Sequence, residues 1–261
     1  MAMDVRGLLI DLDGVVYTGR QAIPGAASFV GQARQRLPFL LVTNNSTAAP
    51  EDVAQRLASM GIEVKPEEIL TSAQAAMAYV RAHSDGHQRV LVVGETGLRA
   101  AAEAEGLEVC EAGAEWVVAG LDRGFDYQKL ARATRAIRAG ARFVASNADA
   151  LLPIEGGDVL PGAGSIVAAI RAATEVEPVV VGKPEPAMFQ AGLLKLGGLE
   201  PSQVAMIGDR LDTDIAGGRA AGLRTILVLT GVTTRALLET HPVHPDAIAD
   251  DLPAVARLLG W

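Results

Sequence analysis

The chain has 261 residues, of which 49% are hydrophobic and 21% charged, so the composition predicts a packed core and excludes a largely disordered protein. A formal net charge of −8 argues against a broad nucleic-acid-binding surface, because such a surface needs a basic face. The single cysteine, Cys110, excludes an intrachain disulfide. We find no secretory signal pattern and no apolar run of the ~18 residues that a membrane span requires. We therefore expect a cytoplasmic protein with no nucleic-acid or membrane partner.

The first 80 residues alternate short apolar runs with alanine-rich stretches of helical period. The pattern predicts strands at residues 7–11, 38–44 and 68–72, and helices at 25–37, 50–61 and 75–82. Such alternation is typical of βαβ units, whose strands form a parallel sheet.

The polar stretch at residues 83–88 resembles a linker, and the alternation begins again after it. The pattern predicts strands at 89–94, 115–122 and 141–147, and helices at 97–106 and 127–140. This middle part therefore has the pattern of a compact α/β unit of its own, which ends in the glycine-rich stretch 155–164.

The last third of the chain returns to the same alternation. It predicts helices at 165–174, 187–198 and 214–222, strands at 178–182, 203–209 and 224–231, and one more strand and helix within 245–260. We predict an α/β fold with a Rossmann-like parallel-sheet core and helices on both of its faces. This core is formed by residues 1–80 and 179–261, and residues 81–178 form an inserted α/β cap.

Polar side chains follow four of the predicted strands, at the point where each strand ends. They are Asp11 with Asp13, Thr43 with Asn44, Lys183, and Asp209 with Asp214. The carboxyl ends of parallel strands line the ligand crevice of an open α/β sheet. We therefore expect the four groups, distant in sequence, to meet at one edge of the core sheet.

Several carboxylates beside one lysine indicate a magnesium site. Mg²⁺ prefers oxygen ligands and takes one or two carboxylates together with substrate phosphate and water. A dication would let Asp11 remain ionised at the mouth of a buried strand. A carboxylate in that place can attack phosphorus, and a second carboxyl two residues on, Asp13, can protonate the leaving oxygen and then activate water.

Four short motifs carry a resemblance to a known family. DLDGVVY, VTNNS, VGKPEP and GDRLDTDI, in this order, resemble the four motifs of the haloacid dehalogenase superfamily. In the middle of the chain, VVAGLDRGFDYQKL, ASNADALLP and LPGAG are similar to the α/β cap of the branch that includes the p-nitrophenylphosphatases and the NagD-type phosphatases. The resemblance covers nearly the whole chain and implies a phosphatase with a capped α/β core.

The resemblance also implies roles for individual residues. Asp11 matches the nucleophile and Asp13 the general acid and base. Thr43 matches the hydroxyl that binds phosphate, and Asn44 would add further donors. Lys183 matches the lysine that neutralises the charge of the nucleophile and of the phosphoryl group.

The implied metal ligands are the carboxylates of Asp11 and Asp209 and the main-chain carbonyl of Asp13. Asp214 matches an acid outside these ligands that positions the water molecules of the metal. In the cap, Asn147 and Asp149 are candidates for substrate contacts, and the alternative is that they are turn residues at a strand end. Caps of this branch often dimerise, so a homodimer through the cap is a further expectation.

Asp13 narrows the reaction, because a dehalogenase of this superfamily needs no acid at that position, whereas an ester does. We predict a Mg²⁺-dependent phosphatase that hydrolyses small phosphorylated metabolites through an aspartyl phosphate. The alternative is a phosphate- or magnesium-responsive binding module, similar to a receiver domain, without turnover. Local alternatives are a helix cap at residues 43–46 and a surface position for Lys183 before a proline-started helix.

Overall fold

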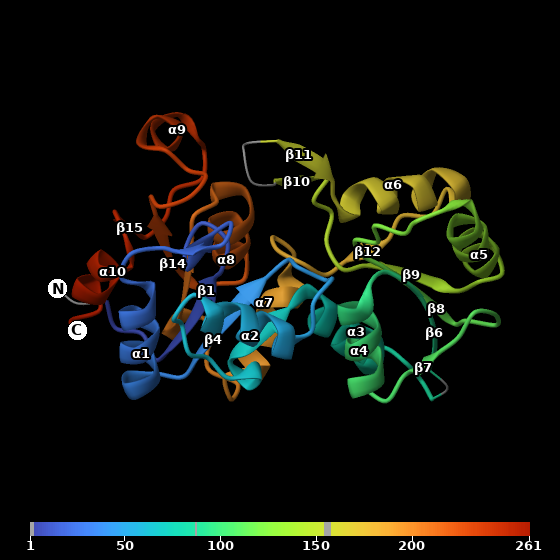
Figure 1. Ribbon diagram of the computed structural model, residues 1–261, viewed down its shortest axis with the longest axis horizontal. Coiled ribbons are helices and arrows are strands. Elements are labelled where there is room, and N and C mark those ends of the chain that lie inside the picture. Colours follow the sequence, from blue (N-terminus) through green and yellow to red (C-terminus); the bar gives the residue numbers. More distant parts are fainter. Residues whose placement is uncertain (1–2, 87, 154–157) are drawn as a thin grey trace. The chain divides into compact units, whose positions relative to one another are not determined.

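Two parallel sheets organise the computed structural model, which describes residues 3–86, 88–153 and 158–261 (Figure 1). The chain divides into two compact units. Unit 1 comprises residues 1–43, 51–70 and 183–261, and unit 2 comprises residues 44–50 and 71–182.

Unit 1 contains a six-stranded sheet in the order β15-β14-β13-β1-β4-β5. Its strands are β1 (Gly7–Asp11), β4 (Phe39–Thr43), β5 (Ile69–Thr71), β13 (Val204–Gly208), β14 (Arg224–Val228) and β15 (Ala247–Ala249). The central strands β13, β1 and β4 are parallel, and every residue in them is buried. Strands that are covered on both faces need continuous apolar runs, which explains why these segments do not alternate with polar residues.

The helices of unit 1 connect these strands and cover the sheet. They are α1 (Ala26–Arg36), α2 (Pro50–Ser59), α7 (Pro186–Lys195), α8 (Ala216–Ala220), α9 (Arg235–Thr240) and α10 (Leu252–Leu258), with short 3₁₀ turns η1 (Pro66–Glu68) and η2 (Pro201–Gln203) and a π-helical turn η3 (Leu211–Ile215). A small hairpin, β2 (Tyr17–Thr18) and β3 (Gln21–Ala22), follows β1. The predicted fold class, a parallel-sheet α/β core, is confirmed.

Unit 2 has its own five-stranded sheet in the order β12-β9-β8-β6-β7, with parallel pairing throughout. Its strands are β6 (Arg89–Val93), β7 (Glu108–Val109), β8 (Trp116–Ala119), β9 (Arg142–Ala145) and β12 (Val179–Val180), and its helices are α3 (Ser72–Ala82), α4 (Thr96–Ala104), α5 (Tyr127–Arg138) and α6 (Ala163–Thr174). A second hairpin pairs β10 (Leu151–Pro153) with β11 (Val159–Pro161). The aliphatic core of this unit lies between its sheet and the helices α5 and α6.

Two elements lie elsewhere than the sequence pattern suggests. The predicted strand at 178–182 exists as β12, but it pairs with β9 in unit 2 and not with the six-stranded sheet. Helix α3, predicted for the core, packs against α4 and β9 of unit 2. A short apolar run fits the edge of either sheet, so its sequence does not determine its partner. The predicted cap boundaries at 80/81 and 178/179 stay a prediction.

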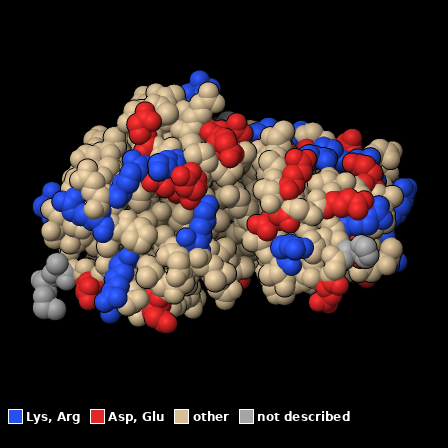
Figure 2. All heavy atoms as spheres, turned by 90° about the horizontal axis from the view of Figure 1, so that it is seen from below, with Lys and Arg blue, Asp and Glu red and all other residues tan. Residues whose placement is uncertain are grey.

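Positive and negative side chains are interspersed on the face of the protein drawn in Figure 2, over both units. Among residues 3–86, 88–153 and 158–261, no helix has the length and apolarity to cross a membrane.

Candidate active site

Three buried carboxylates meet at the carboxyl end of the central strands of unit 1. Asp11 is the last residue of β1, Asp209 directly follows β13, and Asp214 lies in the π-helical turn η3. Each offers one oxygen within a group whose atoms all lie within 4.8 Å of one another. The register explains the meeting, because Ile10 pairs with Ile207 and both strands then end together.

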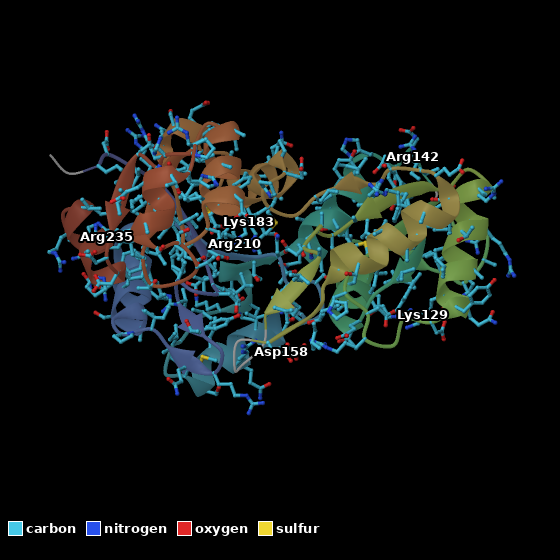
Figure 3. All side chains as sticks on the ribbon, turned by 90° about the horizontal axis from the view of Figure 1, so that it is seen from above. Lys129, Arg142, Asp158, Lys183, Arg210 and Arg235 are labelled. Carbon is cyan, nitrogen blue, oxygen red and sulfur yellow. The ribbon has the colours of Figure 1, made fainter. Side chains whose placement is uncertain are left out.

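Lys183 joins two of these carboxylates. Its Nζ donates to Oδ1 of Asp11 at 2.5 Å and to Oδ1 of Asp214 at 2.8 Å, and the lysine is only 5% exposed. Burial alone would lower the pKa of Lys183, but the charges of Asp11 and Asp214 outweigh burial and raise it. Figure 3 labels this side chain beside Arg210, whose main-chain N–H also binds Asp214. The alternative of a surface lysine is therefore wrong.

The cluster carries more negative charge than its lysine neutralises. Three carboxylates face one ammonium group, which leaves two negative charges without a counterion among these four residues. Burial raises the pKa of Asp11 well above its usual value, as do its neighbours Asp214 and Asp209, whereas Lys183 opposes the shift. Burial, followed by repulsion from Asp214, raises the pKa of Asp209 to about 6. Such shifts are typical of functional sites.

Asp209 has one oxygen bound and one oxygen without a partner. Its Oδ2 accepts the main-chain N–H of Val232 at 2.6 Å, whereas its Oδ1 is buried and has no hydrogen-bond partner among the described residues. Burying a carboxylate oxygen without a partner is costly. A divalent cation fits this oxygen and the excess charge of the cluster, and Asp11 and Asp209 are the carboxylates that would hold it.

Asp214 differs from Asp209 because both of its oxygens are bound. Oδ1 accepts from Lys183, and Oδ2 accepts from the main-chain N–H of Arg210 at 3.1 Å. Gly208 permits this placement, since a Cβ at that position would overlap the Asp214 side chain. Asp212, on the same turn, is exposed and pairs with Arg210.

Asp13 lies two residues beyond β1 and is held by a tyrosine. The hydroxyl of Tyr17 donates to Oδ2 of Asp13 at 3.0 Å, and the main-chain N–H of Gly14 donates to the Tyr17 carbonyl at 2.8 Å. Desolvation raises the pKa of Asp13, and the Tyr17 hydrogen bond and Arg56 oppose it. The residue as a whole is exposed, so water screens part of this effect. A carboxyl with a raised pKa at the site mouth suits proton transfer.

Thr43 is the buried last residue of β4. Asp11 pairs with Val42 across β1 and β4, so Thr43 lies one position beyond that pair at the same end of the sheet. The structure thus brings Thr43, Asp11, Lys183 and Asp209 to the same edge of unit 1, as the sequence predicts.

Asn44 belongs to a polar network in unit 2. Its Nδ2 donates to Oδ2 of Asp149 at 3.0 Å, and its carbonyl accepts from Asn147 Nδ2 at 2.8 Å and from Ser72 Oγ at 2.7 Å. Asn147 is buried, and its Oδ1 accepts the N–H of Asp149 at 3.1 Å. Asn147 and Asp149 therefore anchor the segment that follows Thr43, and their predicted contact with substrate stays a prediction.

The helix-cap alternative for residues 43–46 is wrong. Helix α2 begins only at Pro50, and Asn45 forms an Asx turn in which Oδ1 accepts the N–H of Thr47 at 2.7 Å. Ser46 is buried, and its hydroxyl accepts the N–H of Leu121 at 3.3 Å. The polar residues here fix a loop and do not start a helix.

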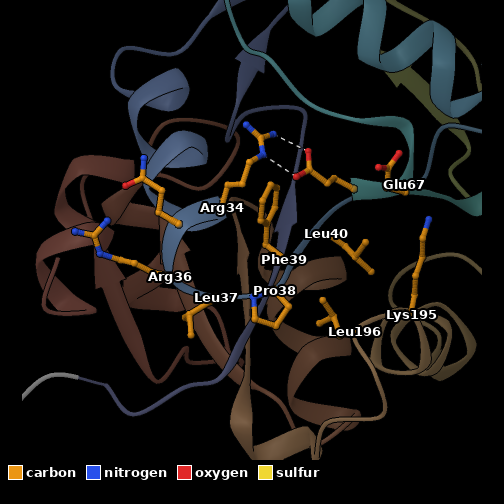
Figure 4. Close-up of a pocket in the computed structure, with 11 residues that line it drawn as sticks. Arg34, Arg36, Leu37, Pro38, Phe39, Leu40, Glu67, Lys195 and Leu196 are labelled. Carbon is orange, nitrogen blue, oxygen red and sulfur yellow. Dashed lines mark hydrogen bonds and ion pairs between the residues drawn. The ribbon is translucent and has the colours of Figure 1, made fainter.

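A cavity of about 430 Å³ lies at the other end of the sheet (Figure 4). Its lining includes Phe39, the first residue of β4, whereas Thr43 is the last. Arg34 and Glu68 close one side of the cavity with a two-pronged ion pair at 2.6 and 2.8 Å. The cavity is therefore separate from the carboxylate cluster, and we assign it no role in the chemistry.

Comparisons with known proteins agree with this site. A family model described as haloacid dehalogenase-like hydrolase matches residues 8–108, and a second, described as HAD-hydrolase-like, matches residues 180–255. An acid sugar phosphatase of Staphylococcus saprophyticus is 42% identical over 256 residues, covering 97% of this chain and 98% of the relative.

Two solved structures are similar over almost the whole chain. A glycerol phosphate phosphatase of Mycobacterium tuberculosis in complex with magnesium is 39% identical with a TM-score of 0.89, covering 98% of this chain and 78% of its own. A 4-nitrophenylphosphatase of Thermotoga maritima is 32% identical with a TM-score of 0.91, covering 98% of both chains.

The fold and the strand-end carboxylates define a hydrolase site of the α/β type. The chain belongs to the haloacid dehalogenase-like hydrolases, in the branch of the p-nitrophenylphosphatases and NagD-type phosphatases. The predictions of this family and of an enzyme that hydrolyses phosphoric monoesters are confirmed. The magnesium complex of a relative and the Asp11–Asp209–Asp214 cluster together suggest a divalent metal.

Sequence reasoning missed residues that support the site. In the sequence, Tyr17 stands at the end of an apolar run, which suggests a core residue. In the structure its hydroxyl binds Asp13, four residues earlier in the chain. Residues 230–233 hold Asp209 and Gly14, and they follow β14, but the predicted strand at 224–231 extends into them and so hides the strand-end signal that selected the other groups. Two of their contacts are made by main-chain N–H groups, which leave no mark in a sequence.

Proposed function

We propose that this phosphatase is magnesium-dependent and hydrolyses small phosphate monoesters through an aspartyl phosphate on Asp11. The observation that carries the proposal is the buried, unpartnered Oδ1 of Asp209 in a cluster where Asp209, Asp11 and Asp214 each bring one oxygen within 4.8 Å of the others and Lys183 already binds Asp11. A dication would compensate for the repulsion between the carboxylates of this cluster. A bound phosphoryl group would add further oxygen ligands for the ion.

Asp11 and Asp209 would hold the ion, with the main-chain carbonyl of Asp13 as the further ligand that the family resemblance implies. When bound, Mg²⁺ polarises the phosphoryl oxygens and neutralises their charge. Asp214 has both oxygens bound to protein donors, so its proposed task is to keep Lys183 in place and to position water molecules of the metal.

The phosphoryl group would bind to the Lys183 ammonium and the Thr43 hydroxyl, with further donors from Asn44. Lys183 is suited to this because its raised pKa keeps it charged at every physiological pH. The positive charge of Lys183 would neutralise the negative charge of the phosphoryl oxygens in the transition state. Groups that are already in place before the reaction contribute most to stabilising that state.

The reaction would proceed in two displacements. A carboxylate oxygen of Asp11 forms a bond to phosphorus as the ester P–O bond breaks, and Asp13 gives its proton to the leaving oxygen. Water then attacks phosphorus while Asp13 accepts its proton, and the bond between phosphorus and Asp11 breaks to release inorganic phosphate. Tyr17, bonded to Asp13 at 3.0 Å, would hold the acid in position through both steps.

The substrate class proposed is small sugar or polyol phosphates, in line with relatives named acid sugar phosphatase and glycerol phosphate phosphatase. Asn147 and Asp149 are the proposed substrate contacts of unit 2, and they would act through the network around Asn44. A panel of phosphate monoesters assayed with the wild type and with Asp149→Asn tests this, because a turn residue would change all substrates equally.

A cytoplasmic location and a homodimer through residues 81–178 complete the proposal, with neither nucleic acid nor membrane as partner. Light scattering of the full chain over a concentration series tests the dimer, since a monomer at every concentration contradicts it. Cell fractionation tests the location.

The experiment for the central function uses p-nitrophenyl phosphate. Turnover should stop in EDTA and return with Mg²⁺, and acid quenching with labelled substrate should trap phosphate on the protein. Unchanged turnover in metal-free buffer would contradict the metal requirement. Absence of turnover with any divalent ion would favour the receiver-like module.

A further inference from the structure

The loop after β14, residues 230–233, contacts Asp209 of the candidate metal site. The N–H of Val232 donates to Oδ2 of Asp209 at 2.6 Å, and the N–H of Thr233 donates to the Asp209 carbonyl at 3.2 Å. The loop therefore fixes both the side chain and the main chain of Asp209. Within the described parts of the chain, the buried Oδ1 of Asp209 has no hydrogen-bond partner.

The same loop also holds the turn that carries Asp13. The hydroxyl of Thr230 donates to the carbonyl of Gly14 at 2.6 Å. Gly14 and Gly231 lie against Asp209 so closely that a Cβ on either would overlap its carboxylate. Gly14 has φ +80°, a left-handed backbone conformation that favours glycine. The φ of Gly231 lies outside the left-handed region.

Gly231 therefore has a steric reason to be glycine. An alanine there meets no backbone strain, but its Cβ would meet Oδ2 of Asp209, the oxygen that Val232 holds. The side chain of Asp209 would have to rotate, which would move Oδ1 as well.

We propose that residues 230–233 form a positioning clamp that binds Oδ2 of Asp209 and so presents Oδ1 to the metal, while Thr230 fixes the Asp13–Gly14 turn against it. This inference rests on the proposed magnesium site and adds the residues that orient its ligand. Removing partners that orient a metal ligand typically costs about 10–100-fold in metal affinity.

The test is isothermal titration of Mg²⁺ into metal-free protein, with the Mg²⁺-induced rise in melting temperature as a second readout. Gly231→Ala should weaken Mg²⁺ binding by about 10-fold or more. Thr230→Val, which keeps the shape of the side chain but removes the hydroxyl, should weaken it by a smaller factor, and Thr230→Ser should restore it.

Gly31→Ala is the matched control. Gly31 lies in α1, and a Cβ on it would meet no atom within 4 Å beyond its chain neighbours and the backbone of its own helix, so the substitution adds the same methyl group away from the site. It should leave Mg²⁺ affinity unchanged. Circular dichroism of each metal-free variant separates loss of metal binding from loss of fold, and the Thr230 pair decides the question if Gly231→Ala does not fold.

The outcomes distinguish this inference from the function on which it rests. Failure of the wild type to bind Mg²⁺ would overturn the proposed function itself. Wild-type binding matched by Gly231→Ala, or equal binding by Thr230→Val and Thr230→Ser, would overturn the clamp and leave the magnesium site intact.

Discussion

Each unit of this protein buries an aspartate near the carboxyl end of a parallel strand, and the two aspartates have opposite surroundings. In unit 2, Asp122 follows β8 and is completely bound, with Oδ2 accepting from Lys129 Nζ at 2.6 Å and Oδ1 from the N–H of Gly124 at 2.9 Å. In unit 1, Asp11 shares one lysine with Asp214 and faces Asp209, which has an unpartnered oxygen.

The difference separates a structural acid from a functional one. Asp122 and Lys129 form a neutral pair whose hydrogen bonds offset the cost of burial. The unit 1 cluster keeps an excess of negative charge that its own hydrogen bonds do not offset. A protein that retains such an arrangement does so for a bound cation or for chemistry, because packing alone would favour neutral residues.

The largest expected effect is on the nucleophile. Asp11→Asn keeps the size and polarity of the side chain but removes the attacking charge, so turnover should fall by orders of magnitude, up to about a million-fold as for other lost nucleophiles. Asp122→Asn is the matched control in unit 2, and it should lose ~1–3 kcal/mol of unfolding free energy with turnover preserved. Steady-state kinetics and urea unfolding measure both. Near-normal turnover by Asp11→Asn would contradict covalent catalysis.

Substitutions of Lys183 should cause the next largest loss of turnover. Lys183→Met removes the counterion of Asp11 and should cost about 1,000-fold in turnover, in the range of other lost electrostatic contacts. Lys183→Arg keeps the charge but its planar fork does not fit the two short bonds to Asp11 and Asp214, so it should lose less but still most of the activity. Equal and mild losses in both variants would mean that Lys183 acts on the fold alone.

The effect of Asp13 should depend on the leaving group. An alkyl phosphate leaves as a strong base and needs the proton of Asp13, whereas nitrophenolate leaves nearly unaided. Asp13→Asn should therefore cost about 100-fold or more with a sugar phosphate and much less in phosphoenzyme formation from p-nitrophenyl phosphate. Phosphoenzyme should accumulate, because water loses its base. Rapid quench with labelled ester detects it, and equal losses without a trapped intermediate would refute this role.

A smaller, graded effect concerns pH. The pKa of Asp209 is raised to about 6 in the metal-free protein, so the proton competes with Mg²⁺ below that pH. Affinity should level off well above pH 6 and fall below it, by up to about tenfold per pH unit for this one carboxylate, since the bound form requires its ionised state. Titrations between pH 4.5 and 8 measure this. The same slope in Asp209→Asn would assign the titration to another group.

The sequence indicates where strand-end side chains of the core sheet meet better than it indicates the connections around them. Asp11, Thr43 and Asp209 can be located because each ends or directly follows an apolar strand of that sheet, and parallel strands end at one edge. Lys183 follows β12 of the other sheet, so this rule does not explain its place beside Asp11. The route of the chain before Lys183 cannot be predicted from the sequence, because β12 is a two-residue strand that fits the edge of either sheet.

Contacts made by the main chain were equally hidden. The N–H of Val232 binds Asp209 whatever its side chain is, so no residue type marks the contact. The place of Asn44 after Thr43 predicts a phosphate ligand, whereas its hydrogen bond to Asp149 depends on a partner 105 residues away. Pairings of that range follow from the tertiary fold and not from local pattern.

The most direct test of the central contrast is isothermal titration of Mg²⁺ into the metal-free wild type, Asp209→Asn and Asp122→Asn. We predict one saturable site in the wild type and in Asp122→Asn, and its loss in Asp209→Asn, because among the residues that the structure describes only the unit 1 cluster has a buried carboxylate oxygen without a partner. Absence of binding to the wild type, or unchanged binding by Asp209→Asn, would contradict the account.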